Sequence, residues 1–545
     1  MPAAPERRQS ASTIARGLWR RWGLDALGML CAIGFALPSL RYPFGMDQPI
    51  HWYAGKGWLE GYMPYATAVS TKPPAVFLVH TASIAVLGDH QWSVRVVDIL
   101  NMLLASALIA TFRPRWPLQN GRARAIRPRA AGELGAACLM MACILYAFFD
   151  WTSLGHPDAW QGTLMMMLAW VVVRAPGGEV GPRRAFFAGV VAGLSLGFKH
   201  VAIVSAVIFG AAAVLMARRD EPISGALRNA IAYVAGLCAV LVALAAPFYL
   251  TGTFGPLREM MVDHIQRYAE HATGDPLRDL GWLGPGHGLA PALLGVALTA
   301  LGIARAVRRG DRRDRWVGIA ILAVVVSALV TVALQRRGFQ AHSYGYQFLV
   351  LAPALALGIA WGLRRLMPGR GGRQLAVAAL LSLVSLALEP EWLSTPGHHY
   401  RAEWRAFAAV LAGRLDHENA LDPYVGHQRT IDNYRRQLAA ARRIDARKRP
   451  GDTLCVDGFI GALYQLTGLR CTSRFMVSVP FLRSASPRWR AEYQRMWDTR
   501  PPTFFVSFSD RVVLAEQMRA RGYRAEVIDD GLEPSFVLFE RRPRP

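Results

Sequence analysis

Long apolar windows recur along most of the chain. Between Trp22 and Glu389 they have roughly the 17–25 residues that a helix needs to cross the hydrocarbon core of a membrane. The window 72–88 opens with Lys-Pro-Pro and is too short for a full crossing, so it predicts a helix at the outer interface. The pair 185–198 and 200–217 fits either two short spans or one re-entrant hairpin. We therefore expect about eleven transmembrane helices, near residues 23–41, 92–112, 132–149, 159–174, 185–198, 200–217, 227–250, 289–304, 316–334, 345–363 and 374–388.

Basic residues are distributed unevenly between these windows. Loop 150–158 holds no lysine or arginine, and loop 251–288 holds three against five acidic residues. Only the turn that contains Arg336 and Arg337 departs from the alternation. Arginine-rich loops lie on the inner side of a membrane, so we expect a cytoplasmic N-terminus and an extracytoplasmic C-terminal region. The arginine-rich segments are 1–22, 113–129, 174–184, 218–228, 305–315 and 364–373.

From His398 onward the pattern changes to that of a mixed α/β globule. The fold class expected is a polytopic α-helical membrane protein with a C-terminal extracytoplasmic α/β domain. We divide the chain into a cytoplasmic N-terminus (1–22), a transmembrane domain (23–390) and a periplasmic domain (391–545). The transmembrane domain includes a first outer loop (42–91) and a mobile outer loop (251–288). In the tail the expected strands are 453–457, 503–507, 524–528 and 535–540, and the expected helices are 424–449, 460–466 and 511–521.

Composition narrows the classes of partner. A net charge of +24 would suggest nucleic acid in a soluble protein, but only four of the 62 basic residues are lysines and the arginines cluster in short loops. We expect a membrane and no nucleic acid as partner. Four of the six cysteines lie in apolar windows, where they are buried hydrophobic residues. Cys455 and Cys471 lie in the tail, and spacing alone leaves open whether they form a disulfide.

Ionisable residues at the outer ends of the windows are the candidates for chemistry. A charged side chain at membrane depth has a high free energy, so such residues usually have a function. Asp47 and Asp158 are the carboxylates, although Asp158 could simply cap the helix that follows it. The two prolines that follow Lys72 restrict its backbone conformation and so fix where its side chain begins. Lys199 lies at an outer turn. The remaining candidates are Arg267 and the site-lining residues His51, Lys56, His156, His264 and His342, of which His264 and Arg267 also fit a solvated helix face.

This set contains the groups needed to move a sugar from a lipid phosphate. A carboxylate orients or deprotonates the acceptor hydroxyl, and cations stabilise the phosphate that leaves. The chain contains no Asp-x-Asp motif and no glycine-rich phosphate loop, which disfavours a nucleotide-sugar donor. A transporter or flippase for lipid-linked saccharides would place its charges near the membrane midplane between repeats. That alternative stays open beside a ligase or polymerase.

The chain resembles the GT-C class of polyprenyl-phosphate-sugar-dependent glycosyltransferases. It is most similar to the branch of aminoarabinose transferases of lipid A and protein O-mannosyltransferases (glycosyltransferase family 39), over roughly residues 20–390 and more loosely the tail. The segments that carry the resemblance are Asp47, 71–74 (Thr-Lys-Pro-Pro), 93–95 (Ser-Val-Arg), 156–158 (His-Pro-Asp), 193–199, 263–268 and 339–344.

The resemblance implies roles for individual residues. Asp47 would be the catalytic base or acceptor-orienting carboxylate, and Asp158 would complete the acidic site. Lys72 would bind the donor phosphate together with Arg267, and Lys199 would be a further cation. The donor would be a polyprenyl-phosphate sugar and the acceptor lipid A, a glycan, a glycolipid or a protein, at the outer face of a bacterial inner membrane.

The sequence also departs from this family at two positions. Many relatives have a glutamate after the first aspartate, where this chain has Gln48. The aminoarabinose branch has a glutamate before Lys-Pro-Pro that shares a metal site with a histidine matching His264, and this chain has Thr71 there. We therefore assign no metal ligand, and dependence on a divalent metal stays open.

Overall fold

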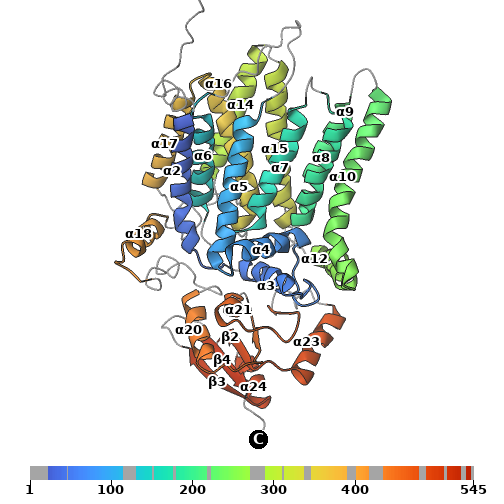
Figure 1. The fold of residues 1–545 in the computed structure, drawn as a ribbon, viewed down its shortest axis with the longest axis vertical. Coiled ribbons are helices and arrows are strands. Elements are labelled where there is room, and N and C mark those ends of the chain that lie inside the picture. Colours follow the sequence, from blue (N-terminus) through green and yellow to red (C-terminus); the bar gives the residue numbers. More distant parts are fainter. Residues whose placement is uncertain are drawn as a thin grey trace, which may run out of the picture.

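The computed structural model describes most of the chain. The described residues are 22–45, 47–113, 130–149, 153–175, 179–217, 222–270, 289–309, 312–336, 345–388, 400–416, 434–458, 460–477, 486–508, 512–528 and 535–541. Figure 1 shows a bundle of helices above a smaller C-terminal domain that contains the sheet, which we call the soluble domain.

A helix lies at each of the expected apolar windows. Five helical segments are long and apolar enough to cross a membrane (Leu24–Arg41, Gln91–Thr111, Ile223–Leu250, Arg315–Leu334 and Gln347–Leu366), and several shorter apolar helices accompany them. The chain is thus a multi-pass membrane protein, and the count of eleven spans stays a prediction. The bundle consists of α2 (Leu24–Ala36) with η2 (Leu37–Arg41), α5 (Gln91–Thr111), α6 (Glu133–Phe148), α7 (Pro157–Val173), α8 (Pro182–Phe198), η4 (His200–Ala202) with α9 (Ile203–Leu215), α10 (Pro222–Leu250), α14 (Leu289–Arg308), α15 (Arg312–Arg336), η6 (Gly345–Leu351) with α16 (Ala352–Leu366), and α17 (Gly371–Leu388).

Glycines allow several helices of the bundle to approach closely. A Cβ atom added at Gly28 of α2 would lie 2.3 Å from the Cα atom of Gly135 in α6. On α8, a Cβ atom at Gly189 would lie 1.9 Å from the carbonyl oxygen of Tyr233 in α10. Membrane helices associate through such close backbone contacts, because lipid supplies no hydrophobic driving force between them.

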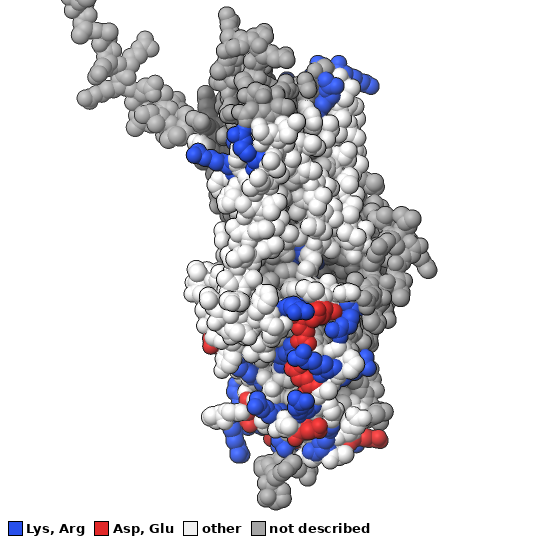
Figure 2. Space-filling model, turned by 90° about the vertical axis from the view of Figure 1, so that its right-hand side faces the viewer, with Lys and Arg blue, Asp and Glu red and all other residues white. Residues whose placement is uncertain are grey.

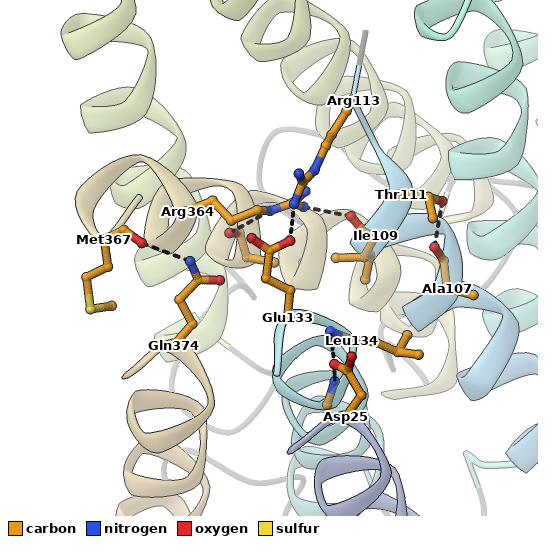
Figure 3. A network of polar contacts seen from close by, with 12 residues as sticks. Asp25, Ala107, Ile109, Thr111, Arg113, Glu133, Leu134, Arg364, Met367 and Gln374 are labelled. Carbon is orange, nitrogen blue, oxygen red and sulfur yellow. Dashed lines mark hydrogen bonds and ion pairs between the residues drawn. The ribbon is translucent and has the colours of Figure 1, made fainter. Parts of the chain in front are cut away.

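The two ends of the bundle carry charge, and the surface between them carries little. On the face shown in Figure 2, a band nearly free of charged residues separates the soluble domain from the basic residues at the opposite end. Figure 3 shows polar contacts at that opposite end, where Arg113 forms an ion pair with Glu133 and the Arg364 guanidinium donates a 2.6 Å hydrogen bond to the Ile109 carbonyl. The Asp25 carboxylate accepts a 2.9 Å hydrogen bond from the Leu134 amide at the start of α6.

Two short helices, α3 (Gln48–Leu59) and α4 (Pro74–Leu87), lie across the lower ends of the bundle rather than along it (Figure 1). Proline occupies the first turn of each helix, where its missing N–H removes no helical hydrogen bond. Gly55 of α3 allows close contact with α4, because a Cβ atom there would lie 2.7 Å from the His80 Cβ atom. The two helices form a platform between the bundle and the soluble domain.

The outer loop after α10 is described up to residue 270. It contains α11 (Phe254–Arg258), the π-helical turn η5 (Glu259–His264) and α12 (Ile265–Glu270). Residues 271–288 of the expected mobile loop lie outside the described residues.

The C-terminal domain contains a four-stranded sheet with the order β1-β2-β4-β3. Strand β1 (Leu454–Val456) pairs in parallel with β2 (Phe504–Phe508), whereas β4 (Phe536–Arg541) pairs antiparallel with β2 and with β3 (Tyr523–Ile528). The sheet is accompanied by α20 (Tyr434–Asp445), α21 (Ala462–Thr467), α23 (Pro487–Thr499) and α24 (Val512–Ala520). Helix α18 (Tyr400–Leu411) lies instead beside the lower end of the bundle (Figure 1), where the Tyr400 ring stacks on Phe35 of α2.

Three helices of the chain after His398 differ from the sequence expectation. Helix α18 was not predicted. Helix α20 begins at Tyr434, and residues 424–433 of the expected helix lie outside the described residues. One face of α20, which includes Arg436 and Ile444, is buried, whereas Arg442 and Arg443 are exposed. Helix α23 was not predicted, although Ser486 followed by Pro487 is a typical helix start and the Ser486 hydroxyl caps the Trp489 amide.

The Sγ atoms of Cys455 and Cys471 lie 2.7 Å apart beside the sheet. A disulfide between them stays a prediction.

Candidate functional site

Five charged or titratable side chains form a connected series at the lower end of the bundle. Lys72 Nζ lies 3.6 Å from Asp47 Oδ2, and His156 Nε2 lies 3.3 Å from the same oxygen. His156 Nδ1 lies 3.0 Å from Asp158 Oδ2. The other oxygen of Asp158 accepts a 2.5 Å hydrogen bond from Lys199 Nζ. The two carboxylates are therefore joined by one imidazole, and each also contacts a lysine.

The two ends of the series are partly accessible and its middle is buried. The side chains of Asp47, Lys72 and Lys199 are 18%, 12% and 10% exposed, whereas those of His156 and Asp158 are 1% and 0% exposed. A substrate can therefore reach Asp47 and the two lysines but not His156 or Asp158. The buried Asp158 is placed to hold His156 in position.

The charges around Asp47 favour its ionised form. Burial alone would raise the pKa of Asp47, but the positive charge of Lys72 and the hydrogen bond from His156 outweigh burial and hold that pKa well below its usual value. Burial and the charge of Lys72 hold the pKa of His51 well below its usual range. The His51 ring centroid lies 5.7 Å from that of His156, so a neutral imidazole borders the series.

Arg95 fixes the segment before α7 against the start of α3. Its guanidinium is fully buried and donates 2.9 Å hydrogen bonds to the Pro43 carbonyl and the Gln48 side chain. Arg95 and Gln48 both also donate to the Leu154 carbonyl. Gly155 has a φ of +76°, and a Cβ atom there would lie 2.8 Å from the Arg95 guanidinium. This network holds Asp47 and the His156 segment at a set separation.

Lys72 is positioned by the loop that precedes it. The Tyr65 hydroxyl donates a 2.8 Å hydrogen bond to the Lys72 carbonyl. Tyr65 itself has a φ of +66°, an unusual backbone conformation for a tyrosine, and is fully buried. The Val69 amide donates a 2.8 Å hydrogen bond to the carbonyl of Arg474 in the soluble domain. The soluble domain therefore contacts the segment that carries Lys72.

The structure brings some of the expected site residues together and places others elsewhere. Asp47, Lys72, His156, Asp158 and Lys199 form the series, with His51 beside it. Lys56 instead pairs with Asp89 at 2.6 Å on the exposed side of the platform.

Of the expected residues of the mobile outer loop, His264 lies against the soluble domain. The His264 ring stacks on Trp489 with centroids 4.6 Å apart. Burial and the neighbouring charge of Arg267 lower the pKa of His264 to about 4. Arg267 is half-buried in α12, and His342 lies outside the described residues.

The sequence analysis did not predict the structural role of Arg95 and Gln48, whose side chains link α3 to the segment before α7. Gln48 was noted only as a departure from the family pattern, yet its side chain links α3 to both Arg95 and Leu154. An arginine in the first turn of an apolar window was the available signal, because a charge at that depth needs a buried partner.

The described residues contain no group of three or more His, Cys, Asp or Glu side chains that could hold a metal ion. Each carboxylate of the series already contacts a lysine. Metal dependence stays open.

Comparisons with known proteins place this geometry in context. A family model for dolichyl-phosphate-mannose-protein mannosyltransferase matches residues 71–249. No curated protein matches the chain by sequence. The structure is similar to the crystal structure of ArnT from Cupriavidus metallidurans bound to undecaprenyl phosphate, with a TM-score of 0.59, 16% identity, and coverage of 96% of this chain and 99% of that one. The apo structure of the same protein matches with a TM-score of 0.56, 14% identity and the same coverage. The chain thus shares the fold of that protein over nearly its whole length.

Proposed function

We propose that this protein is a membrane glycosyltransferase that moves a sugar from a polyprenyl-phosphate donor to an acceptor hydroxyl. The observation that carries this proposal is the accessible pair of Asp47 and Lys72, 3.6 Å apart beside the bundle. The family match to residues 71–249 supports it, because that match begins at the segment containing Lys72. The similarity to a protein solved with undecaprenyl phosphate supports a lipid-phosphate donor.

The pair supplies both groups that this reaction needs. The acceptor oxygen attacks the anomeric carbon, the bond from that carbon to the phosphate oxygen breaks, and polyprenyl phosphate leaves. Lys72 stabilises the charge that builds on the phosphate. Asp47 orients the acceptor hydroxyl and accepts its proton as the new glycosidic bond forms. Because Asp47 stays ionised, it is available for this role throughout the neutral pH range.

The buried part of the series supports Asp47. Asp158 and Lys199 form an ion pair behind His156, and His156 contacts both carboxylates. We propose that Asp158 holds the His156 ring and thereby sets the orientation of Asp47. Phosphate binding by Lys199 and Arg267 remains part of this proposal.

The proposed side of the membrane follows from the arginine distribution. The Asp47–Lys72 pair lies at the end of the bundle next to the soluble domain, opposite the Arg113–Glu133 end. If the arginine-rich end faces the cytoplasm, the reaction takes place on the periplasmic side of a bacterial inner membrane. The acceptor is then lipid A, a glycan, a glycolipid or a protein.

The test is Asp47→Asn in the full chain, reconstituted in liposomes with a panel of radiolabelled polyprenyl-phosphate sugars. We expect transfer to fall by about 10²–10⁴-fold, the usual contribution of a general base, while the protein still inserts. Asp89→Asn is the matched control, because Asp89 is an exposed carboxylate that also pairs with a lysine but does not belong to the series around Asp47. Unchanged release of polyprenyl phosphate by Asp47→Asn would contradict the proposal. Translocation of the donor without any sugar transfer by the wild-type protein would support the flippase alternative.

A further inference from the structure

A cleft separates the outer loop after α10 from helix α23 of the soluble domain. Its volume is about 830 Å³, and the loop side is formed by α11 and η5. Both sides lie on the face shown in Figure 2, where basic and acidic side chains are mixed. The charged residues that line it are Arg258, Glu259, Asp263, Arg474, Arg488, Glu492 and Arg495.

Two of the acidic residues in the cleft are already satisfied by Arg474. The guanidinium of Arg474 donates 2.8 and 2.7 Å hydrogen bonds to the two oxygens of Glu492, and a 3.0 Å hydrogen bond to Glu259. Glu259 also accepts a 2.7 Å hydrogen bond from the Trp489 indole. Arg474 is nearly fully buried, so this group forms the floor of the cleft and joins its two sides.

The remaining arginines form an exposed basic rim. The Arg488 side chain is 80% exposed and approaches Glu259 only at 3.9 Å. Arg258 and Arg495 are exposed, and within the described part of the chain neither makes an ion pair. Asp263 is the one acidic lining residue that Arg474 does not bind. The whole lining thus holds four arginines and three carboxylates, and the excess of positive charge lies on the exposed rim, where three of the arginines are found.

The cleft also adjoins the segment that carries Lys72. Ala66 lines it, next to Tyr65, whose hydroxyl binds the Lys72 carbonyl. The backbone of Arg474 binds Val69 in the same segment. A molecule held in this cleft would thus contact the loop that positions the proposed donor-phosphate cation.

We propose that this cleft binds an anionic group, a phosphate or a carboxylate, of the acceptor. This inference rests on the proposed glycosyl transfer and names the chemistry of the second substrate. Guanidinium groups suit it because their planar forks bind phosphate and carboxylate with paired hydrogen bonds. The anion lies either on a lipid headgroup or on a soluble saccharide.

The test measures binding of inorganic pyrophosphate to the full chain in phosphatidylcholine nanodiscs. All measurements use Lys72→Met, so that the proposed donor-phosphate site does not bind the probe. Arg488→Glu combined with Arg495→Glu should weaken binding by about tenfold or more, because two exposed charge contacts are reversed. Binding should also weaken as salt rises. The matched control is Arg490→Glu with Arg519→Glu, two exposed arginines of the same domain that do not line the cleft.

Equal affinity of the cleft variant and the control variant would overturn the proposal. Nanodiscs that contain phosphatidylglycerol distinguish the two sources of the anion. Competition with pyrophosphate supports a lipid headgroup, and binding without competition supports a soluble anionic saccharide. Sugar transfer by Asp47→Asn is measured separately, in the chain that keeps Lys72, and pyrophosphate binding by Asp47→Asn is measured in the Lys72→Met background. Asp47→Asn should lose transfer and bind pyrophosphate normally, so failure of the catalytic proposal and failure of the cleft proposal give different results.

Discussion

Two lysine–carboxylate pairs in this protein have nearly the same length but differ in burial. Lys199 and Asp158 lie 2.5 Å apart with side chains 10% and 0% exposed. Lys56 and Asp89 lie 2.6 Å apart with side chains 29% and 35% exposed. Each carboxylate also has one further partner, His156 for Asp158 and the Trp52 indole for Asp89. Since distance and number of partners are matched, burial is the main difference between the two pairs.

We predict that Lys199→Met is much more destabilising than Lys56→Met. Removing Lys199 leaves the Asp158 carboxylate buried without its cation, and breaking a buried pair from one side costs about 3–5 kcal/mol. Removing Lys56 breaks a pair that water already screens, and such pairs contribute about 0–1 kcal/mol. Adding Asp158→Asn to Lys199→Met should recover much of the loss, because no uncompensated charge then remains buried.

The measurement is reversible unfolding of the full chain in mixed micelles with a rising fraction of SDS. The difference between the two single variants should persist at high salt, since buried charges are screened far less than exposed ones. Equal destabilisation by Lys199→Met and Lys56→Met would refute the reasoning. So would a double variant less stable than Lys199→Met alone, because it would show that the lone carboxylate is not the source of the loss.

Two further predictions concern the pH profile and the helix packing. Lys72→Gln removes the charge that lowers the pKa of Asp47 and leaves the effect of burial, which raises it. The acidic limb of the pH profile of residual transfer activity should therefore move to higher pH. An acidic limb at unchanged pH would show that Asp47 does not control it. In the wild type, where that pKa is depressed, Asp47 contributes stability above about pH 4 that is lost only as pH falls through the lower folded value. Gly28→Ala should destabilise the bundle by about 1–3 kcal/mol through overpacking. Gly34→Ala should not, because the added Cβ atom meets nothing within 4 Å. Thermal unfolding of both variants in detergent tests this prediction, and equal melting temperatures would contradict it.

The sequence by itself determined the helices of the bundle, and it singled out most of the charged residues that the structure brings together around Asp47. Hydrophobic windows and proline starts are local properties, so the ranges of α5, α7 and α8 follow from short stretches of chain. Asp47, Lys72 and Asp158 were also recognised from their local sequence, because charged residues beside apolar windows are energetically costly and usually have a function.

Only the tertiary structure decided how these residues connect. His156 joins Asp47 to Asp158, and Arg95 holds the Leu154 carbonyl 59 residues away. The contact between Glu259 and Arg474 joins segments 215 residues apart. Such contacts form because packing brings distant elements together and excludes water between them, and no local pattern in the sequence encodes which partner a buried charge will meet.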